Sequence, residues 1–360
     1  MDSSRPKILL VDDNPGNLRI LAETLRHDYT IVVARDGETA LQLARESNPP
    51  DVILLDVMMP GMDGFEVCLR LKSDPITWSI PVLFVTALAE TEAEVRGLTV
   101  GAVDFITKPI VPRLVKARVR SQVELKRHKD HLEELVEQRT REIAITQEAT
   151  IHALASLAET RDPETGGHIR RTQHYVRILA SVLQRHPRFR DTLTDTMVDM
   201  LFKSAPLHDM GKVGIPDQIL LKPGKLTAEE FERMKDHTLL GYKTLEAAQR
   251  SLGSTSFLHL ASEIAFTHHE KWDGAGYPRG LAGDAIPISG RLMALADVFD
   301  ALISCRVYKS AFSHPEAERI IRENRNTHFD PDVVDAFNAR VEDFRQTALD
   351  FADPETDPSR

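Results

Sequence analysis

The chain has 360 residues, enough for two ordinary domains with a core in each, and its formal net charge of -10 argues against a non-specific nucleic-acid binder. Its two cysteines, Cys68 and Cys305, have no zinc-ligand spacing and cannot form a disulfide framework, so we expect a reducing compartment. With no signal-peptide shape and no apolar run as long as a membrane span, the sequence indicates a cytoplasmic protein without membrane insertion.

The first third of the chain alternates short apolar runs with stretches of helical spacing. The apolar runs predict strands at residues 7–11, 30–34, 51–55, 80–85 and 103–107. The stretches between them predict helices at residues 17–27, 37–46, 64–72 and 90–99. Buried strands that alternate with amphipathic helices predict a doubly wound, flavodoxin-like α/β domain with five parallel strands, over residues 5–122.

Polar residues follow four of these strands. They are Asp12, Asp13, Asp56, Thr86 and Lys108. Ligands of open α/β sheets bind at the carboxyl ends of the strands, so we expect these side chains to meet there. Three carboxylates would repel one another without a cation, and oxygen ligands suit Mg²⁺. One carboxylate could accept a phosphoryl group. The alternative is that these are helix caps and ordinary turn residues, but five at matching strand ends favour the site.

Residues 7 to about 122 resemble the receiver domain of two-component response regulators. The resemblance is carried by the motifs VDDN, LLDVMMPGMDG, VTA and TKP. It implies phosphorylation by a cognate sensor histidine kinase and a cis bond before Pro109. The site residues that it implies are the phosphoacceptor Asp56, the Mg²⁺ ligands Asp12 and Asp13, the switch pair Thr86 and Lys108, and the aromatic switch residue Phe105.

Residues 123–148 predict a helical connector. Leu125, Leu132, Val136 and Ile143 recur at spacings of seven, four and seven, as in a coiled coil, although polar residues interrupt the same seam. One interpretation is a signalling helix that pairs with a second copy of the chain in a homodimer. The other is a solvated helix that only spaces two domains.

The remainder of the chain is helical by its spacing and predicts an all-α domain at residues 149–345. The expected helices cover residues 150–160, 166–185, 192–203, 227–236, 239–248, 257–267, 289–304 and 315–324. Residues 346–360 are acidic and contain prolines, so we expect a disordered tail.

Histidines and carboxylates gather beside these helices. His208 is followed by Asp209, and His268 by His269. Neighbouring residues on a regular helix diverge by about 100°, so each pair can serve one site only near a helix end or between two metal ions. Lys212 follows closely enough to neutralise a phosphate.

Three further positions extend this ligand set. Glu164 and His168 lie four residues apart and would share one face of a helix. Asp297 lies in an apolar run, where a buried charge is costly unless it is paired or bound to metal. Imidazole and carboxylate ligands without thiolate suit Fe, Mn, Ni or Zn. Two such ions about 3.5–4 Å apart can clamp an in-line displacement at phosphorus.

Residues from about 150 to 345 resemble the HD-GYP phosphohydrolases, a branch of the HD superfamily. The matching stretches are RDPETGGH, HDMGKVGIPDQILLKPGKL, His237, HHEKWDGAGYP and ADVFDAL. The resemblance implies two or three transition-metal ions, with Fe or Mn ahead of Ni or Zn. The implied metal ligands are Glu164, His168, His208, Asp209, His237, His268, His269 and Asp297.

The same resemblance implies a phosphodiesterase that hydrolyses cyclic di-GMP to pGpG, with GMP left open as a further product. Asp209 and Lys212 are the candidate catalytic residues. The candidate contacts to the substrate phosphates are Lys212, Arg306 and Lys309, and Gly276, Tyr277 and Pro278 form the namesake motif. Asp300 lies in the last matching stretch, but the sequence gives it no role.

Two alternatives stay open. The domain could be a catalytically weak effector that binds the nucleotide or docks a GGDEF-domain diguanylate cyclase through the Gly-Tyr-Pro loop. A different cyclic dinucleotide, such as a GMP–AMP hybrid, would use the same residues. The sequence does not identify the kinase, the metal or the direction in which phosphorylation changes activity.

Overall fold

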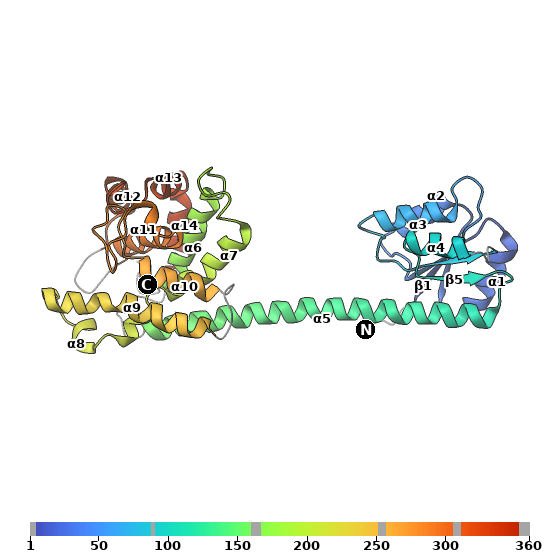
Figure 1. The fold of residues 1–360 in the computed structure, drawn as a ribbon, viewed down its shortest axis with the longest axis horizontal. Helices are drawn as coiled ribbons and strands as arrows, with labels where there is room; N and C mark the ends of the chain where they lie inside the picture. The colour runs from blue at the N-terminus through green and yellow to red at the C-terminus, as the bar shows by residue number, and fades with distance from the viewer. Residues whose placement is uncertain (1–4, 88–90, 160–166, 251–256, 305–310, 353–360) are drawn as a thin grey trace. The chain divides into compact units, whose positions relative to one another are not determined.

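The computed structural model describes residues 5–87, 91–159, 167–250, 257–304 and 311–352. The chain divides between Arg141 and Glu142 into two compact units (Figure 1). Within the described residues, no helix is both long enough and apolar enough to cross a membrane.

The first unit contains a five-stranded parallel sheet with the strand order β2-β1-β3-β4-β5. The strands are β1 (Lys7–Val11), β2 (Thr30–Ala34), β3 (Val52–Asp56), β4 (Val82–Thr86) and β5 (Asp104–Thr107). The helices between them are α1 (Pro15–Leu25), α2 (Gly37–Ala44), α3 (Gly64–Ser73) and α4 (Thr91–Thr99). The predicted doubly wound α/β fold is therefore confirmed.

Alternate residues of the strands enter two separate cores. In β1, Leu9 and Val11 belong to the cluster that includes residues of α2 and α3. Ile8 and Leu10 belong to the cluster that includes residues of α1 and of the helix after β5. Every residue of β3 is buried, which explains why this strand reads as a continuous apolar run that ends in a single aspartate.

Helix α5 (Pro112–Glu159) is one continuous helix of 48 residues that belongs to both units. Near its start, Val115, Val119 and Val123 are part of the core on one face of the sheet. Near its end, Ile151 and Ala155 are part of a core in the second unit. The predicted connector is thus the middle of a longer helix, which has no proline or glycine after Pro112 to interrupt it.

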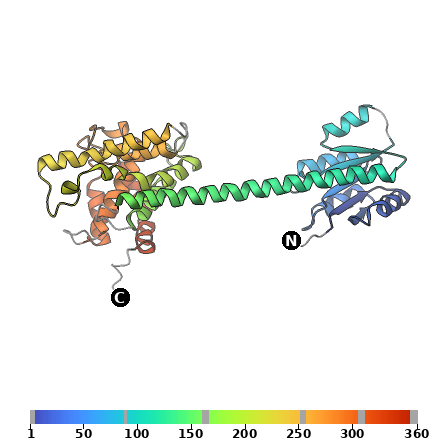
Figure 2. The ribbon, with the colours of Figure 1, turned by 90° about the horizontal axis from the view of Figure 1, so that it is seen from below.

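The second unit is built from helices, as predicted (Figure 2). Its α-helices are α6 (Gly167–Leu183), α7 (Asp195–Ser204), α8 (Asp217–Leu220), α9 (Ala228–Gln249), α10 (Phe257–Thr267), α11 (Ile288–Ile303), α12 (His314–Glu323), α13 (Pro331–Ala339) and α14 (Val341–Asp350). In the part of this unit that the structure describes, three short 3-10 helices accompany them: η1 (Ala205–Leu207), η2 (Met210–Gly214) and η3 (Gly283–Ala285). The two helices expected at 227–236 and 239–248 form the single helix α9, which starts at a capping box between Thr227 and Glu230.

The expected disordered tail is wrong for its first part, because residues 346–350 complete helix α14. Phe344 is fully buried and stacks on Tyr175 of α6, with ring centroids 4.3 Å apart and an angle of 3° between the planes. Thr347 is also buried. The acidic residues made this stretch look solvated, but one side of the helix packs into the main core of the unit. Residues 353–360 of the expected tail lie outside the described residues.

Candidate metal centres

The carboxylates at the sheet edge of the first unit form a candidate cation site. Oxygen atoms of Asp12, Asp13 and Asp56 all lie within 4.8 Å of one another. Nζ of Lys108 lies 3.1 Å from Oδ2 of Asp12 and 2.9 Å from Oδ2 of Asp56. Burial raises the pKa of the Asp56 carboxyl above its usual value, the neighbouring Asp12 raises it further, and Lys108 lowers it. Hard oxygen ligands in this arrangement suit Mg²⁺.

Thr86 and Phe105 lie where the sheet topology predicts. Thr86 ends β4 and is buried, and its carbonyl accepts a hydrogen bond from the amide of Lys108 at 2.8 Å. Phe105 of β5 packs against Phe84, with ring centroids 5.9 Å apart. The Lys108–Pro109 bond is cis, as expected.

The His208–Asp209 pair sits where one short helix ends and the next begins. His208 follows η1 and Asp209 precedes η2, so the two side chains are not separated by the turn of a regular helix. Nε2 of His208 lies 3.4 Å from Oδ2 of Asp209. Just beyond, Gly211 lies against helix α9, and a Cβ there would be 1.9 Å from the carbonyl oxygen of His237. A glycine is therefore required for Asp209 and His237 to approach each other.

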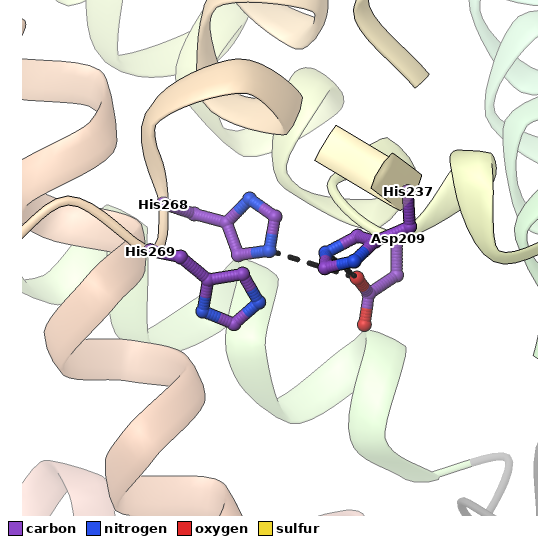
Figure 3. Close-up of side chains that lie close together, drawn as sticks. All are labelled: Asp209, His237, His268 and His269. Carbon is purple, nitrogen blue, oxygen red and sulfur yellow. Dashed lines mark ion pairs between the residues drawn. The ribbon is translucent and has the colours of Figure 1, made fainter. Parts of the chain in front are cut away.

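Four of the expected ligands form a first cluster, made of Asp209, His237, His268 and His269 (Figure 3). Their ligand atoms all lie within 4.8 Å of one another. Oδ1 of Asp209 is 3.4 Å from Nε2 of His237 and 3.6 Å from Nε2 of His268. His268 and His269 follow directly on the end of α10, which lets both adjacent side chains reach the same site.

Three others form a second cluster, made of His168, His208 and Asp297. Nε2 of His168 lies 3.4 Å from Nε2 of His208 and 3.8 Å from Oδ1 of Asp297. The two clusters meet at Asp209, since its Oδ1 faces the first cluster and its Oδ2 faces His208. This carboxylate lies between the two clusters and could supply one oxygen to a cation in each.

The donor atoms of these clusters fit divalent metal ions. Among the described residues, Oδ1 of Asp209 and Nε2 of both His237 and His268 are buried without a hydrogen-bond partner. Nδ1 of His237 lies 2.7 Å from the carbonyl of Met234, and a carbonyl can only accept. The hydrogen is therefore on Nδ1, and Nε2 presents its lone pair. Burial lowers the pKa of His237 to about 4, so the ring is neutral and ready to ligate at pH 7.

A carboxylate that the sequence left without a role supports the second cluster. Oδ2 of Asp300 lies 2.8 Å from Nδ1 of His168, and Nε of Arg171 donates to Oδ1 of Asp300 at 2.6 Å. All three side chains are buried. The signal in the sequence was a second aspartate one helical turn after Asp297 in the same apolar run, but nothing in the sequence pointed to Arg171.

The loop that contains Gly276, Tyr277 and Pro278 lies beside the first cluster. The ring of Tyr277 is 4.7 Å from that of His269. The loop is held by Glu270, a buried residue that the sequence did not single out, whose carboxylate accepts hydrogen bonds from the amides of Arg279 and Leu281 at 2.8 and 2.9 Å.

Lys212 is the one expected phosphate contact within the described residues. Its Nζ lies 2.8 Å from Oδ2 of Asp209, on the side of that carboxylate that faces His208. Glu164, Arg306 and Lys309 lie outside the described residues.

Comparisons with known proteins agree with both units. Residues 8–120 match the response regulator receiver domain family, and residues 152–333 match the HD domain family. The chain is 50% identical over 363 residues to a probable cyclic di-GMP phosphodiesterase of Vibrio cholerae, covering 99% of this chain and 82% of that one. It is 36% identical to the cyclic di-GMP phosphodiesterase response regulator RpfG of Xanthomonas campestris, covering 91% and 86%.

A third relative has a different stated substrate. The 3'3'-cGAMP-specific phosphodiesterase 2 of Vibrio cholerae is 41% identical over 199 residues, which cover 55% of this chain and 36% of that one. Two family matches, and relatives that align with nearly the whole chain, agree with the five-stranded sheet and the histidine–aspartate clusters. The chain therefore belongs to the response regulators in which a receiver domain is followed by a metal-dependent phosphodiesterase domain of the HD family.

Proposed function

We propose that this protein hydrolyses cyclic di-GMP to pGpG under the control of phosphorylation at Asp56. The observation that carries the proposal is the position of Asp209 between two clusters of imidazole ligands, with Lys212 beside it. The names of the relatives that align over almost the full chain support the substrate.

The two clusters would each hold one metal ion, with Asp209 shared between them. When bound, the ions would activate water and stabilise charge on the phosphate oxygens. Fe and Mn are the first candidates and Ni and Zn the next, because histidine and carboxylate donors suit all four.

Lys212 has two roles in this proposal. Its ammonium holds the carboxylate of Asp209 in place at 2.8 Å, and it presents positive charge to a substrate phosphate. The roles of Arg306 and Lys309 as phosphate contacts and of Glu164 as a metal ligand remain proposals that rest on the family resemblance.

In the receiver, Asp12, Asp13 and Asp56 would hold Mg²⁺, and Asp56 would accept the phosphoryl group from a cognate histidine kinase. Lys108 already contacts both Asp12 and Asp56, so it can stabilise the added charge without a large movement. Helix α5 would carry the change, since its two ends lie in the cores of the two units.

The test combines metal analysis with turnover on one preparation. The protein is purified without added metal, analysed for its elements, and assayed for pGpG with and without acetyl phosphate. We expect at least two Fe or Mn ions per chain and the appearance of pGpG. The double variant with His208→Ala and Asp209→Ala should lose both; if it still hydrolyses cyclic di-GMP, the proposed site is wrong.

The same assay separates the alternatives. A 3'3'-cGAMP substrate, run in parallel, tests the activity that one relative's name states. Bound metal without turnover of either nucleotide, even after acetyl phosphate, favours a binding or docking role for the Gly-Tyr-Pro loop. A Tyr277→Ala variant that hydrolyses normally but no longer binds a GGDEF-domain cyclase would favour docking as an added role.

We also propose that the protein forms a homodimer along α5. Leu125, Leu132, Val136 and Ile143 are each 58–68% exposed and recur with heptad-like spacing. Substituting Val136→Lys together with Ile143→Lys should shift the mass measured by light scattering from dimer to monomer. Ile145→Lys is the matched control, because Ile145 is equally exposed but lies outside this spacing.

A further inference from the structure

The guanidinium of Arg171 joins three parts of the second unit that are far apart in sequence. Arg171 lies on α6, one turn after His168, and is almost fully buried. It donates to both oxygens of Asp300, from Nε at 2.6 Å and from Nη2 at 2.9 Å. It also donates from Nη1 to the backbone carbonyl of Phe351 at 3.0 Å, and from Nη2 to the hydroxyl of Ser304 at 3.1 Å.

Asp300 connects Arg171 to the metal ligand His168. Its Oδ2 lies 2.8 Å from Nδ1 of His168, and the same oxygen accepts from Nη2 of Arg171. An ionised carboxylate can only accept, so Nδ1 of His168 carries the hydrogen. Nε2 is then left with a lone pair, which faces His208 and Asp297.

His168 differs in this respect from three other histidines of the two clusters. Nδ1 of His208, His237 and His268 each lies about 3 Å from a backbone carbonyl on the preceding turn or segment, at 2.9, 2.7 and 3.0 Å. Their rings are oriented by the local backbone. The ring of His168 is oriented by a side chain 132 residues away in sequence. Its orientation can therefore be lost while the helix that carries it stays folded.

We propose that Asp300 and Arg171 are positioning residues for the cluster of His168, His208 and Asp297, and that the carbonyl of Phe351 completes their support. The inference rests on the metal centre proposed above. In this proposal the segment after α14 supports only the cluster of His168, His208 and Asp297. The cluster of His237, His268 and His269 does not depend on that segment.

A purely structural ion pair would give a different result from a positioning pair. If Asp300 and Arg171 only fasten α6 to α11, then their loss should lower the stability of the whole unit and affect both metal clusters alike. If they orient His168, then one metal position should weaken and the other should stay occupied. Loss of an outer partner of a metal ligand typically lowers metal affinity about 10–100-fold.

The first experiment compares Asp300→Asn with the wild type and with Ser304→Ala. Ser304→Ala is the control, because it removes one contact of Arg171 and the 3.3 Å hydrogen bond from Ser304 to Oδ2 of Asp300, and leaves the Asp300–His168 contact in place. Each protein is loaded with Mn²⁺ and examined by elemental analysis and electron paramagnetic resonance. We expect the wild type and the control to show a coupled pair of Mn²⁺ ions. Asp300→Asn should hold one fewer ion and give the signal of an isolated Mn²⁺.

The second experiment tests the contribution of Phe351. A chain that ends at Asp350 lacks the carbonyl that Arg171 contacts, whereas a chain that ends at Ala352 keeps it. We expect the shorter chain to lose the coupled pair and the longer chain to keep it. Phe351→Ala should also keep it, because the carbonyl remains although the contact of the ring with His174 is lost.

The outcomes separate this inference from the proposed function. A wild-type protein that binds no metal contradicts the proposed centre itself. A metal-loaded wild type whose coupled pair survives in Asp300→Asn overturns the positioning role, and survival in the chain that ends at Asp350 overturns the role of Phe351. If Asp300→Asn does not fold by circular dichroism, Arg171→Lys replaces it. Arg171→Lys keeps a buried cation but cannot contact both Asp300 oxygens and Phe351 in the same geometry.

Discussion

Among the described residues, the candidate cation site of the receiver and the candidate metal centre of the second unit differ in chemistry and in the way their ligands are held. In the receiver, three carboxylates meet at a sheet edge, and one of them, Asp13, is exposed to solvent. Lys108 already supplies one positive charge there. In the second unit, imidazoles dominate, His168, His208, His237 and His268 are buried, and their rings are fixed by hydrogen bonds through Nδ1.

The two kinds of ligand lead us to expect different rates of cation exchange at the two sites. Oxygen ligands open to water suit a cation that exchanges and a carboxylate that must meet a phosphate donor. Neutral, buried imidazoles with fixed tautomers suit ions that remain bound through many turnovers. We therefore expect a switch site that is loaded only when needed, and a catalytic site that is loaded permanently.

The largest expected effect comes from removing the carboxylate between the two metal clusters. Asp209→Ala should lower the rate of cyclic di-GMP hydrolysis at least about 10³-fold, because both metal positions lose a shared ligand worth several kcal/mol to the transition state. Elemental analysis should show the loss of metal in the same protein. Asp56→Asn is the counterpart in the receiver: it should abolish the response to acetyl phosphate and leave the transition-metal content unchanged. If Asp209→Ala kept its full metal content, Asp209 would not be a ligand shared by the two clusters.

Metal removal should distinguish the two sites next. Dialysis against a chelator of moderate strength should strip Mg²⁺ from the receiver quickly and leave Fe or Mn in the second unit, because nitrogen ligands in a buried site hold transition metals more firmly than open carboxylates hold Mg²⁺. Elemental analysis over time measures both losses. Loss of all metals at the same rate would contradict the distinction.

Two glycines offer a matched pair of smaller effects. A Cβ on Gly211 would lie 1.9 Å from the carbonyl oxygen of His237, and one on Gly64 would lie 2.2 Å from that of Asp56. Each alanine variant should destabilise its own unit by about 1–3 kcal/mol, since the backbone must move to admit a methyl group. Thermal unfolding measures the stability. Gly211→Ala should also reduce the transition-metal content, and Gly64→Ala should not. The reverse result would contradict the role of Gly211 in bringing Asp209 close to His237.

The smallest effect is expected at the exposed acid of the receiver. Asp13→Asn should weaken Mg²⁺ binding only a few-fold, because interactions of exposed charges are worth about 0.2–1 kcal/mol. A Mg²⁺ titration followed by fluorescence or calorimetry would measure it. Asp12 is buried, so Asp12→Asn should weaken Mg²⁺ binding more. If the two variants lost the same affinity, solvent exposure would not predict how much each ligand contributes.

The sequence predicted the receiver site because a topological rule converts linear order into position. Once the apolar runs are recognised as parallel strands, Asp12, Asp56, Thr86 and Lys108 must lie at one edge. The structure brings Asp12, Asp56 and Lys108 into contact there. In the helical unit no such rule exists, and the family resemblance, not spacing, implied one undivided set of ligands. The division into a cluster with His168 and His208 and a cluster with His237 and His268 came from the structure.

What the sequence could not predict is how distant residues support the ligands. Arg171 and Asp300 are 129 residues apart, and neither belongs to a periodic pattern that would pair them. Composition was misleading at the end of the chain, where acidic residues suggested disorder. Helix α14 instead packs Phe344 against Tyr175 and pairs Arg345 with Glu318.

Helix α5 has a consequence for how a signal could travel. Ala155 and Ala158 line a small cavity together with His208 and Asp209, so the last turns of the helix form part of the wall of the metal centre. Val119, about ten turns before Ala155 on an ideal helix, lies in the core of the receiver.

Between these positions there is no glycine or proline at which torsion could be absorbed. We therefore expect part of a rotation imposed at Val119 to reach Ala155 through the continuous helix between them. Control of this enzyme would then act through rotation of α5. A rotation that starts in the receiver would shift Ala155 and Ala158, and with them the distance between His208 and Asp209.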